Sequence, residues 1–160
     1  MATDYFLKLT GIPGESQDSK HKDEIQLETW NWGASNATSF GVGSGGGAGK
    51  VSMQDFHFTM PINVASAKLM LACATGEHIT TGVFTARKAG TEQQEYFKIT
   101  FTDVLVSSYN VSGHSSDTLP SDSVGLSFSK IEYEYKPQKT DGSLGAAQKV
   151  GYDIKANKKL

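Results

Sequence analysis

Apolar and polar side chains alternate along most of this chain with a period of two residues. The clearest run lies near the N-terminus, where Tyr5, Leu7 and Leu9 share one face and the segment 11–14, Gly-Ile-Pro-Gly, ends the run. Period two is typical of strands that bury one face. Strands at this spacing, separated by polar turns, predict a mainly β domain. Further strands are predicted at about 24–35, 51–60, 80–88, 95–111, 123–135 and 149–156.

Two of these strands carry large apolar groups in both phases. Over 24–35, the alternation places Ile25, Leu27, Thr29 and Asn31 on one face and Gln26, Glu28, Trp30 and Trp32 on the other. Two occupied faces suit a barrel wall that is covered outside by a helix or a neighbouring subunit. Over 123–135, the apolar phase shifts, which predicts a bulge or face change near Ser129 and Lys130.

The segment 63–75 is the one stretch with a helical pattern. Leu69, Met70, Ala72 and Cys73 form an apolar stripe. Asn63 is a residue type that caps helix N-termini, and Gly76 suits the position after the last turn. The sequence therefore predicts one short helix beside a β-barrel.

A glycine tract over 41–49 separates two predicted strands. It is not a phosphate-binding loop, because Ser44 occupies the first glycine position and Val51 the hydroxyl position of that motif. It does not open a helix, as a dinucleotide fingerprint must, since the residues that follow alternate like a strand. We expect a flexible arm that leaves the fold between two strands.

Composition narrows the function classes. The 160 residues fit a single domain, 1–160, and the net charge of −2 gives no positive field for nucleic acid. One cysteine, Cys73, excludes an intramolecular disulfide. Asp4 and Lys8 interrupt the first apolar run, so we expect no signal peptide, and no run approaches the roughly 20 apolar residues of a membrane span.

Candidate chemistry is sparse. The histidines lie in separate segments without the spacing of a metal site, so no metal, cofactor or catalytic residue is predicted and the chain is not expected to be an enzyme. Glu132 and Glu134 share a strand face, where a solvated surface is favoured over a catalytic carboxylate pair. Hydroxyl side chains on strands suit either an exposed β-surface or the wall of a wet lumen. They are Thr81, Thr85, Thr100, Thr102, Ser107 and Ser108.

Read from end to end, the chain resembles the hemolysin-coregulated protein (Hcp) family, the tube subunits of the bacterial type VI secretion system. The resemblance rests on the order of short motifs along nearly all 160 residues. The motifs are Gly14-Glu15-Ser16, His21, Glu24-Ile25, Trp30-x-Trp32-Gly33, Gly49-Lys50, Gln54-Asp55-x-x-Phe58, Leu69 to Cys73, Gly76, His78, Arg87-Lys88-Ala89-Gly90, Val104-Leu105-Val106-Ser107-Ser108, Tyr133-x-Tyr135-x-Pro137-Gln138 and Gly151-Tyr152-Asp153-Ile154.

This resemblance implies a β-barrel of two antiparallel sheets with one flanking helix, assembled as a homohexameric ring. Such rings stack into a tube inside a contractile sheath, below a VgrG-type spike protein, and are expelled with it. Small effector proteins travel in the lumen, where the ring also acts as their chaperone. Export by this route needs no signal peptide, so the chain is expected to be assembled in the cytoplasm and secreted.

The resemblance also implies roles for particular residues. Asn31 becomes a candidate lumen and effector contact, while Trp30 and Trp32 are candidate apolar anchors of the subunit interface. Residues 36–50 resemble the family's extended loop, which reaches the adjacent ring. The alternative is a stand-alone secreted β-barrel module that binds a ligand. The inter-ring candidates are Phe40, Gly41, Gly43, Gly45, Gly46, Gly47, Gly49 and Lys50.

Overall fold

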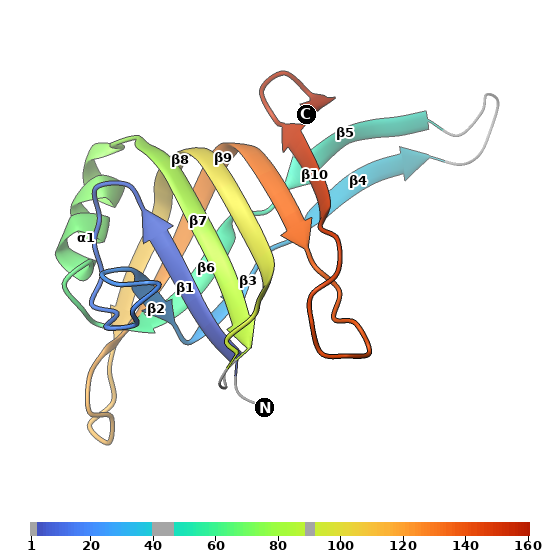
Figure 1. The fold of residues 1–160 in the computed structure, drawn as a ribbon. Coiled ribbons are helices and arrows are strands. Elements are labelled where there is room, and N and C mark those ends of the chain that lie inside the picture. The colour runs from blue at the N-terminus through green and yellow to red at the C-terminus, as the bar shows by residue number, and fades with distance from the viewer. Residues whose placement is uncertain (1–2, 40–46, 89–91) are drawn as a thin grey trace.

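The computed structural model describes residues 3–39, 47–88 and 92–160 (Figure 1). Eleven strands and one helix are found within these ranges, which confirms the mainly β fold with a single short helix. The elements are β1 (Thr3–Leu9), β2 (Ile25–Leu27), β3 (Thr29–Asn31), β4 (Ala34–Ser39), β5 (Gly47–Met53), β6 (Phe56–Pro61), α1 (Ser66–Thr75), β7 (Ile79–Lys88), β8 (Glu95–Ser112), β9 (Ser121–Tyr135), β10 (Gln148–Asp153) and β11 (Lys158–Lys159).

A nine-stranded antiparallel sheet curls around the core, with α1 against one side of it (Figure 1). The main path runs β11-β10-β9-β8-β7-β1-β2, while β9 also pairs with β6, and β6 with β3. Just after β2, the chain reaches the β6 branch, where the Glu28 N–H donates to the Thr59 carbonyl oxygen at 2.9 Å. The predicted pair of sheets thus takes the form of one curled sheet and a separate two-stranded ribbon, β4–β5.

Aromatic side chains fill the inside of the curled sheet. Phe56, Phe84 and Phe101 are fully buried, and the ring of Phe56 lies 5.3 Å from that of Phe84 and 5.1 Å from that of Phe101, measured between centroids. Alternate residues of each strand contribute to this core because successive side chains of a strand point to opposite faces. The remaining residues form the outer face.

The strand predicted at 24–35 was wrong as a single element. The chain breaks at Glu28, where its partner changes from β1 to β6. The inward phase changes with the partner: Ile25 and Leu27 are buried, and after the break Trp30 packs on the core while Asn31 is exposed. A strand keeps its alternation only while it stays in one pairing register, so the predicted faces do not extend past Glu28.

The predicted face change in β9 is confirmed, since the buried residues Leu126 and Ile131 are in opposite phases. On the neighbouring strand, Asp103 lies between the residues paired with Phe128 and Lys130 and has a φ of 56°, a left-handed conformation uncommon outside glycine. The register shift between β8 and β9 lies elsewhere, between residues 106 and 108 of β8.

The helix begins later than predicted, at Ser66. Asn63 does not cap it: Ala65 holds the N-cap position, and the Asn63 side-chain oxygen accepts from the Ala65 N–H at 2.8 Å instead. The predicted end is confirmed, with Gly76 at a φ of 71°. Of the predicted apolar stripe, Leu69 and Ala72 are buried, whereas Met70 is exposed. Within the described ranges, no helix has the length and hydropathy to cross a membrane.

Candidate functional site

The outer face of four adjacent strands, β3, β6, β9 and β8, carries hydroxyl, amide and imidazole side chains. We name this surface the polar outer face. Its residues alternate with inward residues such as Trp30, Phe58 and Val124, so the hydrophobic core itself fixes which side chains point outward. The polar outer face consists of Thr29, Asn31, His57, Thr59, Ser108, Asn110, Ser112, Ser121 and Ser123.

Cross-strand pairing places the predicted lumen residue Asn31 in a defined row. Asn31 lies opposite His57, His57 opposite Gly125, and Gly125 opposite Ser108. Residues directly opposite one another in antiparallel strands have neighbouring side chains on one face. Asn31 and His57 are both exposed. The next row holds Thr29, Thr59, Ser123 and Asn110, with a 2.6 Å hydrogen bond between the first two hydroxyls.

Gly125 lies at the centre of this face and leaves room for its neighbours. A Cβ at this position would lie 2.6 Å from Ser108 Oγ and 3.0 Å from both Ser107 Oγ and His57 Cε1. The register shift of β8 brings both serine hydroxyls close to this glycine, and Ser107 donates to a carboxylate oxygen of Asp55. The exposed His57 side chain lies beside the same glycine.

The hydroxyl residues singled out in the sequence divide between two places. Ser107 and Ser108 belong to the surroundings of Gly125. Thr81, Thr100 and Thr102 are half-buried on β7 and β8, in a different part of the sheet. Thr85 is buried at 2% exposure opposite Phe6, on the face where His21 packs. Sequence alternation could not separate these positions, because it does not show what covers a strand face.

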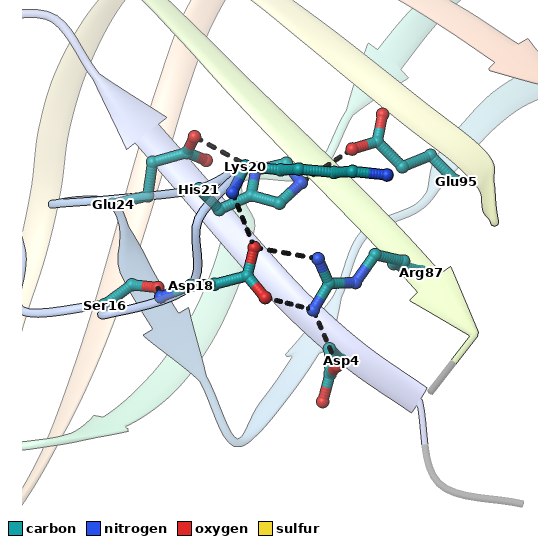
Figure 2. Close-up of polar contacts among 8 residues, drawn as sticks. All are labelled: Asp4, Ser16, Asp18, Lys20, His21, Glu24, Arg87 and Glu95. Carbon is teal, nitrogen blue, oxygen red and sulfur yellow. Dashed lines mark hydrogen bonds and ion pairs between the residues drawn. The ribbon is translucent and has the colours of Figure 1, made fainter. Parts of the chain in front are cut away.

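A buried ionic cluster holds the loop 13–24 over β1 and β7 (Figure 2). Arg87 is 2% exposed and donates to both carboxylate oxygens of Asp18, at 2.9 and 2.7 Å, and to Asp4 at 3.0 Å. Its guanidinium also lies 4.9 Å from the centre of the Phe6 ring. The hydrogen bonds that Arg87 donates hold the pKa of Asp18 far below its usual range, and the carboxylates of Asp18 and Asp4 that accept them raise the pKa of Arg87.

His21 ties the same loop to a third strand. One ring nitrogen lies 3.0 Å from a Glu24 carboxylate oxygen and the other 2.7 Å from one of Glu95, at the start of β8 (Figure 2). The imidazole stacks on Phe6 with 4.3 Å between ring centroids. Of these residues, the sequence analysis singled out only His21 and Glu24, as motif members, and no spacing rule connects them to Glu95. The cluster supports the fold and lies apart from Asn31.

The other charged candidates make pairwise contacts. Glu132 lies 3.7 Å from Lys149, and Glu134 lies 3.7 Å from Lys136, so each of the two strand carboxylates is matched with a lysine. His78 contacts Asp103 at 2.6 Å, and this hydrogen bond, with a second from Lys155, lowers the pKa of Asp103. His114 contacts the Ser116 hydroxyl within one turn.

The β4–β5 ribbon projects from the barrel (Figure 1). At its base Ala34 pairs with Met53 and Asn36 with Val51, and the register shifts before Thr38. A flexible arm was expected here, and over the described part of 36–50 the structure shows two paired strands. Of the predicted inter-ring residues, Gly47, Gly49 and Lys50 belong to β5. The others, Phe40, Gly41, Gly43, Gly45 and Gly46, lie outside the described residues.

The two tryptophans occupy different environments. The ring of Trp30 packs 4.6 Å from Phe84 and 5.8 Å from Phe97, and thus forms part of the core. Trp32, just after β3, lies 6.3 Å from Tyr133 at the edge of the barrel. Its indole N–H is buried and has no hydrogen-bond partner among the described residues.

Comparison with known proteins confirms the family to which these features belong. Residues 6–135 match the family described as "Type VI secretion system effector, Hcp", so the chain belongs to the Hcp family of the type VI secretion system. Over 159 residues it is 42% identical to protein hcp1 of Pseudomonas aeruginosa, with 98% of each chain covered.

Solved structures agree. The crystal structure of Hcp1 from Salmonella typhimurium matches with a TM-score of 0.81 and 37% identity, covering 100% of both chains. The structure of a type six secretion system protein matches with a TM-score of 0.94 and 30% identity, covering 99% of this chain and 100% of the other.

Proposed function

We propose that this chain is the structural, non-enzymatic subunit of the type VI secretion tube, which forms homohexameric rings that stack end to end. The observation that carries the proposal is the family match, which covers the barrel, the ribbon and the polar outer face together. A cyclic ring requires a heterologous interface, in which two different patches of each subunit meet. The elongated shape, with a ribbon on one side of the barrel and α1 on the other, supplies such different surfaces (Figure 1).

The polar outer face lines the lumen in this proposal, and Asn31 lies within it. Apart from His57, its members are uncharged hydroxyl and amide side chains. Such groups keep hydrogen-bonding to water, so the face gains little by packing against a protein neighbour. A wet wall without strong charge suits the passage of small effector proteins of differing charge. Asn31 and the hydroxyls around Gly125 would then contact the effector.

The β4–β5 ribbon is the inter-ring device in this proposal. Gly49 permits close backbone packing within it: a Cβ there would lie 2.7 Å from the Ala37 carbonyl oxygen. A two-stranded ribbon alone is marginally stable in water, so docking on a second ring would stabilise it. The family membership supports the remaining partners, a VgrG-type spike at the tube end and a surrounding contractile sheath, and supports secretion by the type VI route.

The alternative of a secreted ligand-binding barrel has less structural support. Small barrels that bind a ligand hold it inside the sheet. Here Phe56, Phe84 and Phe101 occupy the inside and are fully buried. The tube subunit is therefore the better reading of the same fold.

The first test is the mass of the purified protein by light scattering on a sizing column, over a range of concentrations. A stable species of six times the 17.2 kDa chain mass, seen as rings by electron microscopy, is the expected result. A monomer at every concentration would overturn the proposal.

A second test removes the outer part of the ribbon. Replacing residues 37–50 with Asn-Gly joins Asn36 to Val51, a native cross-strand pair, through a two-residue hairpin turn. We expect single rings to persist and end-to-end tubes to be lost. A chain shortened in the exposed 114–118 turn is the control. Normal tubes from the ribbon variant would refute the inter-ring role.

A further inference from the structure

The sheet of this protein extends beyond the barrel and keeps its apolar inner face there. The first half of β9 pairs with β6, and its second half pairs with β10, which projects from the barrel (Figure 1). Along the inner face, exposure rises from 4% at Ile131 to 39% at Tyr133 and 45% at Tyr135, and reaches 68% at Val150, opposite Tyr133. The apolar inner face of the barrel therefore continues onto a part of the sheet that is exposed to solvent.

Aromatic contacts connect this exposed face to the core. The Phe97 ring lies 4.8 Å from Tyr133 and 5.8 Å from Trp30, and Trp30 packs on the buried Phe84. A surface hollow of about 370 Å³ opens between Tyr96, Phe97, Tyr133 and Tyr135. We call these four residues and Val150 the aromatic wing. Its rigid aromatic side chains are of the type enriched in the buried centres of protein interfaces.

The charges around the aromatic wing are matched within the chain. Glu132 of β9 lies 3.7 Å from Lys149 of β10, Glu134 lies 3.7 Å from Lys136 just after β9, and the Lys88 ammonium lies 5.9 Å from the centre of the Tyr96 ring. A strongly charged partner would gain no selective attraction here. A partner with a near-neutral apolar surface fits, and this chain itself has a net charge of only −2.

The backbone at the wing is also open to pairing. Among the described strands, β11 covers only Tyr152 and Asp153 of β10, which leaves the edge at 148–150 without a strand partner. Unpaired strand edges attract further backbone pairing unless something covers them. An apolar face next to an open edge is the combination expected where another protein chain packs.

We infer that the aromatic wing is the surface on which the next copy of this chain docks within the ring. The inference rests on the proposed tube function and names the patch that the ring closure uses. It also gives the tryptophans separate roles: Trp30 supports the wing from the core, and Trp32, beside Tyr133, borders it. The partner copy buries Tyr133, Tyr135 and Val150.

The test is Val150→Asp, compared with Val64→Asp. Both valines are largely exposed, at 68% and 57%, so neither change should unfold the single chain. Val64 lies two residues before α1, and α1 and β10 lie on opposite sides of the barrel (Figure 1). We expect Val150→Asp to raise the concentration needed for half-assembly at least about tenfold, since it places a charge in a desolvated contact. Val64→Asp should assemble like the native chain. Tyr135→Ser should act in the same direction as Val150→Asp.

A mixing experiment adds a readout that misfolding would not produce. Val150→Asp chains keep their other interface, so adding them to native chains should lower the yield of closed rings, because each one interrupts a heterologous contact. Native assembly of Val150→Asp and Tyr135→Ser, with rings intact, would overturn the inference and leave the tube function standing. A native chain that never assembles would instead overturn the tube function itself.

Discussion

Arg87 offers the sharpest test of how this fold is held together. The change Arg87→Met keeps the unbranched stem that packs near Phe6 but removes the guanidinium. Three hydrogen bonds to carboxylates disappear, at 2.7 and 2.9 Å to Asp18 and 3.0 Å to Asp4. Both carboxylates then lose their cation, and the loop 13–24 loses its strongest tie to β7.

The expected loss follows from the burial of the partners. Breaking a buried ion pair from one side typically destabilises a protein by about 3–5 kcal/mol. The side chains of Asp18 and Asp4 are 19% and 30% exposed, so water replaces part of what Arg87 supplied. We therefore expect a loss of free energy of unfolding at the lower end of this range, about 3 kcal/mol, which lowers the Tm by roughly 6–12 °C for a chain of this size.

Urea unfolding monitored by the fluorescence of Trp30 and Trp32 measures this change. The experiment is run at two protein concentrations, because assembly raises the apparent stability. Lys22→Met removes an exposed charge from the same loop and should stay within about 0.5 kcal/mol of the native chain. If Arg87→Met also stays within that margin, the cluster does not stabilise the fold and the reasoning fails.

Three further predictions concern the same framework. Gly14→Ala should destabilise the chain by about 1–3 kcal/mol in thermal melts, because its Cβ would lie 2.5 Å from the Glu24 carbonyl oxygen; an unchanged Tm would contradict this. Ser66→Ala removes the hydroxyl that donates a 2.5 Å hydrogen bond to the fully buried Asp122, and should lower the free energy of unfolding by about 1–3 kcal/mol. An unchanged free energy of unfolding would mean that another donor replaces this hydroxyl. Because the pKa of Asp18 is depressed in the folded chain, its ionised carboxylate stabilises the fold above about pH 4, and this stabilisation is lost as the pH falls. The urea midpoint of the native chain should therefore drop more between about pH 5 and pH 3 than that of the Arg87→Met chain. Equal drops in the two chains would refute the link.

Local patterns in the sequence predicted the longer strands well, but they missed the breaks within 24–35 and 51–60, which the structure divides into β2, β3 and the start of β4 and into β5 and β6. Alternation located the strands at 80–88, 95–111 and 123–135 to within a few residues, because a half-buried strand imposes its period on the sequence directly. Gly76 marked the helix end through its left-handed backbone. The helix start was missed because Asn63 is one of several polar residues whose capping depends on backbone angles that composition does not reveal.

The candidate site was only partly visible in the sequence. Asn31 was identified through the family resemblance, but nothing local indicated that His57, Gly125 and Ser108 form its row, since these residues are 26, 94 and 77 positions away from it along the chain. The aromatic wing was missed for a similar reason. Tyr133 and Tyr135 alternate like core residues, and the sequence does not show that β6 stops covering β9 at that point.

The sequence by itself determined the class of fold and the approximate positions of the long strands β7, β8 and β9, because a half-buried strand leaves a signal within a few neighbouring residues. It also indicated the family, through the order of short motifs along the whole chain. Only the tertiary structure decided which face of each strand is inside, why the chain turns over at Glu28, and how Arg87 joins three segments. Those features depend on which strand lies beside which and in what register. A shift of one residue in that pairing exchanges the inside of a sheet for its outside while the sequence stays the same.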